Sequence, residues 1–461
     1  MTLEQQFPPS GDATERRPLS ANQEFFCAFD RGNDQGAFGP RHLECGGWRL
    51  HGELDLDALQ FALNDVVERH EGLRTLIVRD EGAPHARVSP PGPAELTVTD
   101  LAAGDDDAAR ERRAHEFLNE VESGRCEITK MPLLRAELGR FDDRDAVLVL
   151  VTHHTVSDGW SMHLIMRDVA ISYAKRRGFP VPDLPPLRQQ GEHASWQQEA
   201  LASETANLAR EYWKGKLAGG KFVTLPPDRV RDLEVTAAYS VYRFVVGKQL
   251  TAATTAFARS MRCSPFMVLY ACFNLFLHRR TGADDIVAPT LTSGRGEPEF
   301  QETVGPFFNF VPVRTGLTGC ESFRDLVHRT RATLLEAYSN ELPFREIAAQ
   351  AEPGLMQPFM DPHGVVTAFE VLQYPESSLM GEEVGDVRFA DLRRRLISHP
   401  NTSEIPDGNL WALDLDPAGD MIGTLKYNSL HFDEPSIVAM VEEYEELLRE
   451  SLAHPDSALT R

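Results

Sequence analysis

The sequence predicts a two-lobed protein that mixes helices and strands, an α/β or α+β fold, on three observations. The chain has 461 residues, two to three times the length of an ordinary domain, so one compact core is not expected. Strand and helix patterns alternate without the regular strand–helix–strand rhythm of a doubly wound sheet. A proline-dense segment over residues 178–186 interrupts these patterns and predicts an interdomain connection.

The N-terminal part is expected to form a tail over residues 1–17 and a lobe over residues 18–178. The run over residues 146–151 is unbroken, apolar and β-branched, which is typical of a buried central strand. The elements expected in this lobe, in chain order, are helix 54–67, strand 73–78, helix 105–122, strand 146–151 and helix 159–173.

A proline-rich linker over residues 179–190 and a C-terminal lobe over residues 191–461 are expected to follow. Ser264-Pro265 interrupts one long helical pattern, and glycine and proline break the segment 294–312. The elements expected in this lobe are helices 191–217 and 249–280, strand 286–291, helix 322–339, strand 422–427 and helix 434–452.

Composition limits the class of function. Apolar residues make up 42% and charged residues 25%, as in ordinary globular chains. The formal net charge of −23 disfavours a reader of phosphate backbones, so no nucleic-acid partner is expected. The apolar runs are too short to span a bilayer and no secretory signal is visible, so we expect a cytoplasmic protein without a membrane partner. The 6 Cys form no CxxC pair and give no support for a zinc site.

The chemistry-bearing side chains concentrate between Val151 and Trp160. His153 and His154 end the predicted strand, and Asp158-Gly159 opens the next helix. Because neighbours on a strand point to opposite faces, we expect one imidazole to face a cleft and the other the packed interior. An imidazole suits a general base near neutral pH, and an Asp at this place caps the helix or pairs with Arg.

Gly159 is expected to let the backbone approach a partner closely where a side chain would obstruct. The competing interpretation is a pair of ordinary core histidines beside a helix cap. Two adjacent histidines on a strand are poorly placed to chelate one metal ion, so a metal site is not expected.

The run His153–Gly159 matches the pattern HHxxxDG, and with it the sequence resembles the condensation domains of nonribosomal peptide synthetases, over roughly residues 18–455. Phe25-Phe26 stands where the opening motif of that family usually has Arg-Leu-Trp. The other segments that resemble family motifs, in chain order, are Pro18–Glu24, Arg69–Thr75 (RHExLRT), Tyr212–Lys214 with Leu225–Arg229, Val304–Asn309 (VGxFxN), Leu342–Phe344 (LPF) and Tyr427–Asp433 (YNxxLFD).

The resemblance implies two chloramphenicol acetyltransferase-like lobes in a V-shaped arrangement with a tunnel between them. It implies that His154 is the catalytic or positioning histidine, that His153 and Asp158 are structural, and that Arg295 is the partner of Asp158. Asn309 matches a family position near the active centre. Without the resemblance, Arg295 would be interpreted as a loop cation and Asn309 as a turn residue.

The resemblance further implies no intrinsic cofactor, because the phosphopantetheine arm that carries the donor belongs to a carrier-protein partner. The sequence shows no adenylation motif and no carrier Ser motif, so we expect a free-standing condensation enzyme whose carrier acts in trans. The reaction expected is transfer of an aminoacyl or acyl group to an amine or hydroxyl of a small-molecule or carrier-bound acceptor. Amides near Gly159 are expected to stabilise the developing oxyanion.

Two other functions stay open at this point: epimerisation of a carrier-bound aminoacyl group, and a non-catalytic recruitment platform of the same fold. Two basic runs, Lys175–Arg177 and Arg393–Arg395, are candidate contacts for an acidic carrier, although most charge runs are simply solvated.

Overall fold

The structure is a computed structural model that describes residues 16–80, 82–102, 104, 106–232, 235, 237–393, 398–399, 402, 405, 408–416 and 419–459. Most of the tail expected over residues 1–17, and Arg394 and Arg395 of one basic run, therefore lie outside the described residues. The chain divides into two compact units. Unit 1 comprises Met1–Glu199, Ser293–Phe308 and Tyr374–Arg394, and unit 2 comprises Ala200–Thr292, Asn309–Gln373 and Arg395–Arg461.

Unit 1 is built on a six-stranded sheet in the order β12-β13-β1-β6-β5-β4. Its helices are α1 (Ala21–Ala28), α2 (Leu56–Arg69), α3 (Asp107–Glu122), α4 (Gly159–Arg176) and α5 (Gln190–Leu201), the last crossing into unit 2. Its strands are β1 (Leu43–His51), β4 (Glu95–Asp100), β5 (Leu134–Asp142), β6 (Asp145–His153), β12 (Glu382–Val384) and β13 (Val387–Asp391), with β2 (Thr75–Val78) and β3 (His85–Val88) in a separate hairpin.

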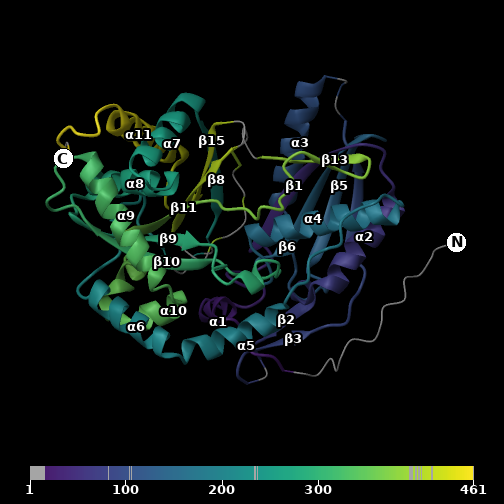
Figure 1. Ribbon diagram of the computed structural model, residues 1–461, viewed down its shortest axis with the longest axis horizontal. Coiled ribbons are helices and arrows are strands. Elements are labelled where there is room, and N and C mark those ends of the chain that lie inside the picture. Colours follow the sequence, from purple (N-terminus) through teal and green to yellow (C-terminus); the bar gives the residue numbers. More distant parts are fainter. Residues whose placement is uncertain are drawn as a thin grey trace. The chain divides into compact units, whose positions relative to one another are not determined.

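The sheet of unit 1 has a core on each face. Strand β6 lies between β1 and β5, antiparallel to both, and all of its residues are buried, as its apolar run predicts. Alternate side chains of β6 pack with α2 and α4 on one face of the sheet and with α3 on the other (Figure 1). The junction of β6 and α4 is therefore held by cores on both sides.

Unit 2 contains a seven-stranded sheet whose main order is β10-β9-β11-β14-β15-β8, with β7 paired to β11. Helix α8 packs against α7, α9 and α11 in the core of this unit (Figure 1). Its strands are β7 (Thr224–Leu225), β8 (Tyr239–Val246), β9 (Asp285–Thr292), β10 (Asn309–Gly316), β11 (Val365–Val371), β14 (Asn409–Leu415) and β15 (Met421–Asn428). Its helices are α6 (Glu204–Leu217), α7 (Lys248–Ser260), α8 (Pro265–Thr281), α9 (Phe323–Ser339), α10 (Phe344–Gln350) and α11 (Glu434–Ala453).

The boundary between the units differs from the predicted one. The proline-rich segment 179–190 is not an interdomain linker but part of unit 1, and the segments 293–308 and 374–394 return to unit 1 instead of joining the lobe expected over 191–461. Hydrogen bonds hold the proline-rich segment in place: Gln189 donates to the Arg69 carbonyl at 2.9 Å, and the Thr303 hydroxyl donates to the Arg188 carbonyl at 2.7 Å. Proline ended the regular structure here, as expected, without ending the unit.

Two features of the described residues bear on the expected function. No single helix there is long and apolar enough to span a membrane; α7 and α8 pass that test of length and composition only as a pair bent by 105°. Among the same residues, no group of three or more His, Cys, Asp or Glu side chains is arranged to hold a metal ion.

Candidate active site

The HHxxxDG segment runs from the end of β6 to the first turn of α4, all within unit 1. His153 is fully buried and bonded at both ring nitrogens. Its Nε2 donates to the Gly39 carbonyl at 3.0 Å, and its Nδ1 accepts from the Thr155 hydroxyl at 2.8 Å. Burial lowers the pKa of His153 to about 4. A neutral, fully bonded ring of this kind fits the structural role that the resemblance implies.

The two ring nitrogens of His154 differ in their contacts, unlike those of His153. Its Nδ1 lies 2.8 Å from the Ser157 carbonyl oxygen, which accepts only, so Nδ1 carries the proton and Nε2 keeps its lone pair. The rings of His42 and Phe308 pack beside the imidazole, with centroids 4.9 and 5.0 Å away. The side chain of His154 remains 22% exposed. The Nε2 edge is therefore free to take a proton, as a general base requires.

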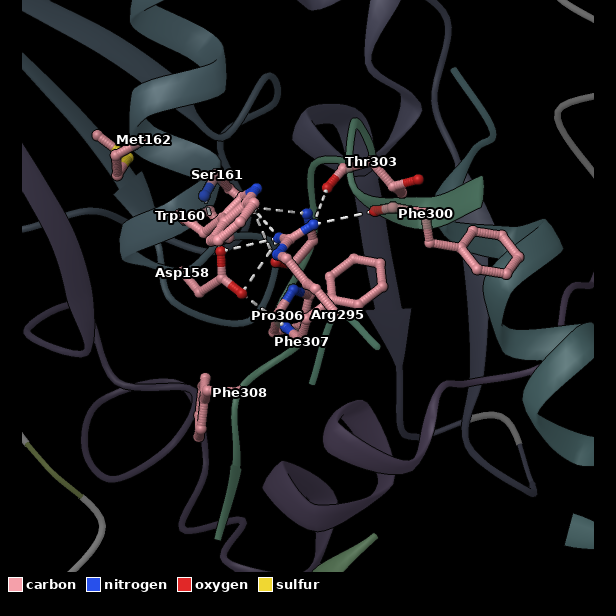
Figure 2. Close-up of polar contacts among 12 residues, drawn as sticks. Asp158, Trp160, Ser161, Met162, Arg295, Phe300, Thr303, Pro306, Phe307 and Phe308 are labelled. Atoms are coloured by element: carbon pink, nitrogen blue, oxygen red, sulfur yellow. Dashed lines mark hydrogen bonds and ion pairs between the residues drawn. The ribbon is translucent and has the colours of Figure 1, made fainter. Parts of the chain in front are cut away.

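Asp158 and Arg295 form the buried ion pair expected for them. Asp158 is the N-cap of α4, where its Oδ1 accepts from the Ser161 amide at 2.8 Å. Arg295 Nη2 lies 3.0 Å from the same oxygen, and the Phe307 amide donates to Oδ2 at 2.9 Å (Figure 2). Arg295 also donates to the carbonyls of Phe300 and Thr303, at 3.1 and 2.8 Å.

The guanidinium of Arg295 therefore joins the HHxxxDG segment to the returning segment 293–308, as Figure 2 shows. It lies over the Phe307 ring, 4.0 Å from the centroid. Burial lowers the pKa of Arg295, and the facing Asp158 carboxylate opposes this shift. Gly294, with φ of +63°, begins this turn, and a Cβ there would lie 1.9 Å from the Phe307 carbonyl oxygen.

Two further motif segments brace the same region of unit 1. In the RHExLRT-like segment, Arg69 and His70 both contact the buried carboxylate of Asp168, each at 2.8 Å. Arg167 of α4 binds Asp168 at 2.6 Å and Glu302 of the returning segment at 2.7 Å. These are support contacts, and none of them involves a ring atom of His154.

The opening motif has a comparable role in support. Ser20 and Gln23 form a capping box that starts α1. Asn22 donates to the carbonyls of Pro306, at 3.0 Å, and of Phe308. The replacement of the usual Arg-Leu-Trp by Phe25-Phe26 therefore leaves the anchoring of the returning segment in place.

Asn309 belongs to unit 2 and is described within that unit. It begins β10 of unit 2, where its side chain donates to the Leu342 carbonyl at 2.8 Å and to Glu341 at 3.0 Å. It accepts from the Phe344 amide at 3.0 Å. Asn309 thus fastens the LPF-like segment to β10, as a residue that satisfies backbone groups does.

Gly159, the first residue of α4, does not adopt a left-handed backbone. A Cβ added there would meet one atom within 4 Å, the Glu44 Oε1 at 3.9 Å. The packing of the described residues therefore does not require glycine at this position, and no close backbone approach is seen there among them. The Ser161 amide bonds to the Asp158 side chain and the Met162 amide to the Asp158 carbonyl, while the amides of Gly159 and Trp160 precede the first intrahelical bond.

Glu44 lies beside His154 and is a candidate site residue that the sequence patterns did not single out. Strand β1 pairs with β6 so that Glu44 lies opposite Thr152, which puts its side chain on the same face as that of His154. The Glu44 Oε2 lies 3.8 Å from the His154 Nε2. A lone acid between Leu43 and Cys45 in an apolar strand was the available signal.

The basic run Lys175–Arg177 lies at the end of α4. Arg176 pairs with Asp65, and Arg177 lies 2.6 Å from Asp386. Lys175 is exposed and lines a surface groove together with Asp65 and Asp183. Two of the three charges are thus already paired, and the run stays no more than a candidate carrier contact.

Comparison with known proteins defines the class. The family model described as "Condensation domain" matches residues 47–461. The chain therefore belongs to the condensation-domain family, which works in nonribosomal peptide and antibiotic biosynthesis and whose members are generally acyltransferases that act with carrier proteins. It has the two-lobed chloramphenicol acetyltransferase-like fold of that family.

Three similar proteins show how closely this chain resembles individual members of known structure or sequence. The SgcC5 protein of Streptomyces globisporus is 43% identical, with a TM-score of 0.91 over 96% of this chain and 100% of that one. The X-domain from teicoplanin biosynthesis is 23% identical with a TM-score of 0.78 over 98% of each chain, which shows a shared fold. A linear gramicidin synthase protein of Brevibacillus parabrevis is 28% identical over 89% of this chain, and the match spans 8% of that protein's length.

Proposed function

We propose that this protein is a free-standing condensation enzyme that transfers an acyl or aminoacyl group from a carrier-bound thioester to a hydroxyl of a small acceptor. The observation that carries the proposal is the state of His154. Its Nδ1 is committed to the Ser157 carbonyl at 2.8 Å, and its Nε2 edge is open. That arrangement gives a general base with a defined tautomer.

In the proposed reaction, the acceptor hydroxyl donates its proton to His154 Nε2 while its oxygen attacks the thioester carbonyl. The tetrahedral oxyanion is stabilised by amide donors, for which the N–H groups of Gly159 and Trp160 at the start of α4 are the candidates. The intermediate collapses with cleavage of the C–S bond. His154 then returns the proton to the departing thiolate of the phosphopantetheine arm, so an ester and a free thiol result.

Comparison with SgcC5 supports a hydroxyl acceptor that is not carrier-bound. That protein, 43% identical to this chain and matched over its whole length, was crystallised in complex with (R)-1-(2-naphthyl)-1,2-ethanediol and sucrose. The diol is a small aryl alcohol. A base also assists a hydroxyl, the weaker nucleophile, more than it assists an amine.

The donor is proposed to arrive on a carrier protein, because condensation domains of peptide synthetases act with carriers and the chain shows no nucleotide-binding loop of the GxxxxGK[ST] type. The test is product formation, followed by mass spectrometry, from donor-loaded carrier with the naphthyl diol and with matched amines. We expect the ester, with a higher kcat/KM for the carrier-loaded donor than for the acyl-CoA. Solvent proton exchange at the α-carbon without a second substrate would indicate epimerisation, and no turnover with any donor would favour a recruitment platform.

A further inference from the structure

Glu44 is the acidic side chain that faces the open edge of His154. Its Oε2 lies 3.8 Å from His154 Nε2, and its side chain is 27% exposed. No hydrogen bond to this carboxylate is found within the part of the chain that the structure describes. Among the described residues its capacity to accept hydrogen bonds is therefore unused, and the partly exposed carboxylate lies beside the Nε2 atom of His154.

The distance between Glu44 Oε2 and His154 Nε2 limits how Glu44 can act on the imidazole. At 3.8 Å the two atoms are too far apart for a hydrogen bond between them. The tautomer of His154 is already fixed from the other ring nitrogen, by the Ser157 carbonyl at 2.8 Å. Glu44 is therefore not the residue that orients the imidazole. A ligand whose hydroxyl donates to Nε2 would instead lie beside the carboxylate.

The charge of Glu44 favours one class of acceptor. A carboxylate close to an amine stabilises the protonated ammonium, which has no lone pair for attack. A hydroxyl stays neutral beside the same carboxylate and donates to it, and a hydrogen bond to a charged acceptor is about twice as strong as one between neutral groups. The pairing of a base and a carboxylate on one edge thus suits a molecule with two neighbouring hydroxyls.

We infer that Glu44 determines acceptor specificity: it accepts a hydrogen bond from the second hydroxyl of a 1,2-diol whose attacking hydroxyl donates to His154 Nε2. This inference rests on the proposed function and names the acceptor class within it. Gly159 supports it, because a Cβ there would lie 3.9 Å from Glu44 Oε1. The absence of a side chain at this position leaves space beside the carboxylate for the second hydroxyl.

The test is calorimetric binding of three probes to the full chain without any carrier. They are (R)-1-(2-naphthyl)-1,2-ethanediol and its two single-hydroxyl analogues, 1-(2-naphthyl)ethanol and 2-(2-naphthyl)ethanol. We expect the protein to bind the diol at least about tenfold more tightly than either mono-alcohol. Glu44→Ala should reduce this preference to within about threefold, and Glu44→Gln, which keeps one neutral acceptor oxygen, should give an intermediate value.

The matched control is Glu383→Gln, because Glu383 is an exposed acid on β12 of the same unit; it should keep the full preference for the diol. Equal binding of the diol and the mono-alcohols by the unaltered protein, or a preference that survives Glu44→Ala, would overturn the inference. Failure of the proposed function has a different signature. The diol preference would then depend on Glu44 as expected, while no ester formed from any donor-loaded carrier.

Discussion

The Asp158 carboxylate and the Arg295 guanidinium lie 3.0 Å apart with both side chains buried, and 137 positions of sequence separate them. This contact fixes the start of α4 and the returning segment 293–308 to each other within unit 1. The His154 imidazole lies just ahead of this helix and packs against Phe308 at the end of that segment. The ion pair therefore supports both sides of the candidate base.

Removal of one member of this pair should destabilise the protein strongly. Asp158→Ala strands the Arg295 charge in the interior, and we expect a loss of about 3–5 kcal/mol in the free energy of unfolding, measured by urea denaturation. Arg295→Ala should cost a similar amount, and the double variant less than the sum of the two. His154→Ala is the control and should stay within about 1 kcal/mol of the unaltered protein. Additive single effects would show that the two side chains do not interact.

Replacement by alanine should affect stability at Gly294 and activity at Gly159. Gly294 has φ of +63° and a Cβ there would lie 1.9 Å from the Phe307 carbonyl, so Gly294→Ala should lower the melting temperature and shift the Arg295 turn. At Gly159 there is space for the methyl group, so Gly159→Ala should fold normally. We expect the methyl group instead to lower kcat/KM by about tenfold, through obstruction beside Glu44.

If Gly159→Ala keeps the kcat/KM of the unaltered protein, Gly159 does not lie beside the bound acceptor. A stable Gly294→Ala with unchanged melting temperature would show that the turn accommodates a side chain by moving Phe307.

Three buried histidines of unit 1 should make stability depend on pH. Burial lowers the pKa of His153, His163 and His193 to about 4 each. Between this value and the unfolded value near 6.5, the unfolded chain binds protons that the folded chain does not. The stability that depends on keeping these rings neutral is fully present above about pH 6.5 and is lost as the pH falls towards 4. Each ring then lowers the free energy of unfolding by at most about 3 kcal/mol.

The measurement is the urea midpoint at pH 7, 6 and 5, which should fall steadily. His163→Phe removes one of the three groups and should flatten the dependence. A midpoint independent of pH over this window would contradict the buried, neutral state of these rings.

Local patterns were sufficient to predict the elements that hold the HHxxxDG segment. The apolar run over residues 146–151 predicted β6, observed over Asp145–His153, and helical spacing predicted α4. Ser264-Pro265 marked the break between α7 and α8 because Ser264 caps the second helix and Pro265 takes its first position. Strand alternation separated the buried His153 from the exposed edge of His154.

Features set by distant pairing could not be predicted in this way. Residues 374–394 join unit 1 because β13 pairs with β1, a contact between strands more than 300 residues apart that has no local signal. The proximity of Glu44 to His154 depends on the register of β1 against β6. The pairing of Asp158 with Arg295 was predicted from the resemblance to condensation domains, and no spacing rule connects these two positions.

The most direct test of the account is the single-turnover rate of acyl transfer from donor-loaded carrier to the naphthyl diol, measured for the unaltered protein and for His154→Ala. The Nδ1 of His154 is bonded to the Ser157 carbonyl, and the proposed function makes Nε2 the base, so loss of this side chain should slow the chemical step by about 10²–10⁴-fold. The melting temperature should be unchanged. A rate within about threefold of the unaltered protein, under conditions where chemistry is limiting, would contradict the account.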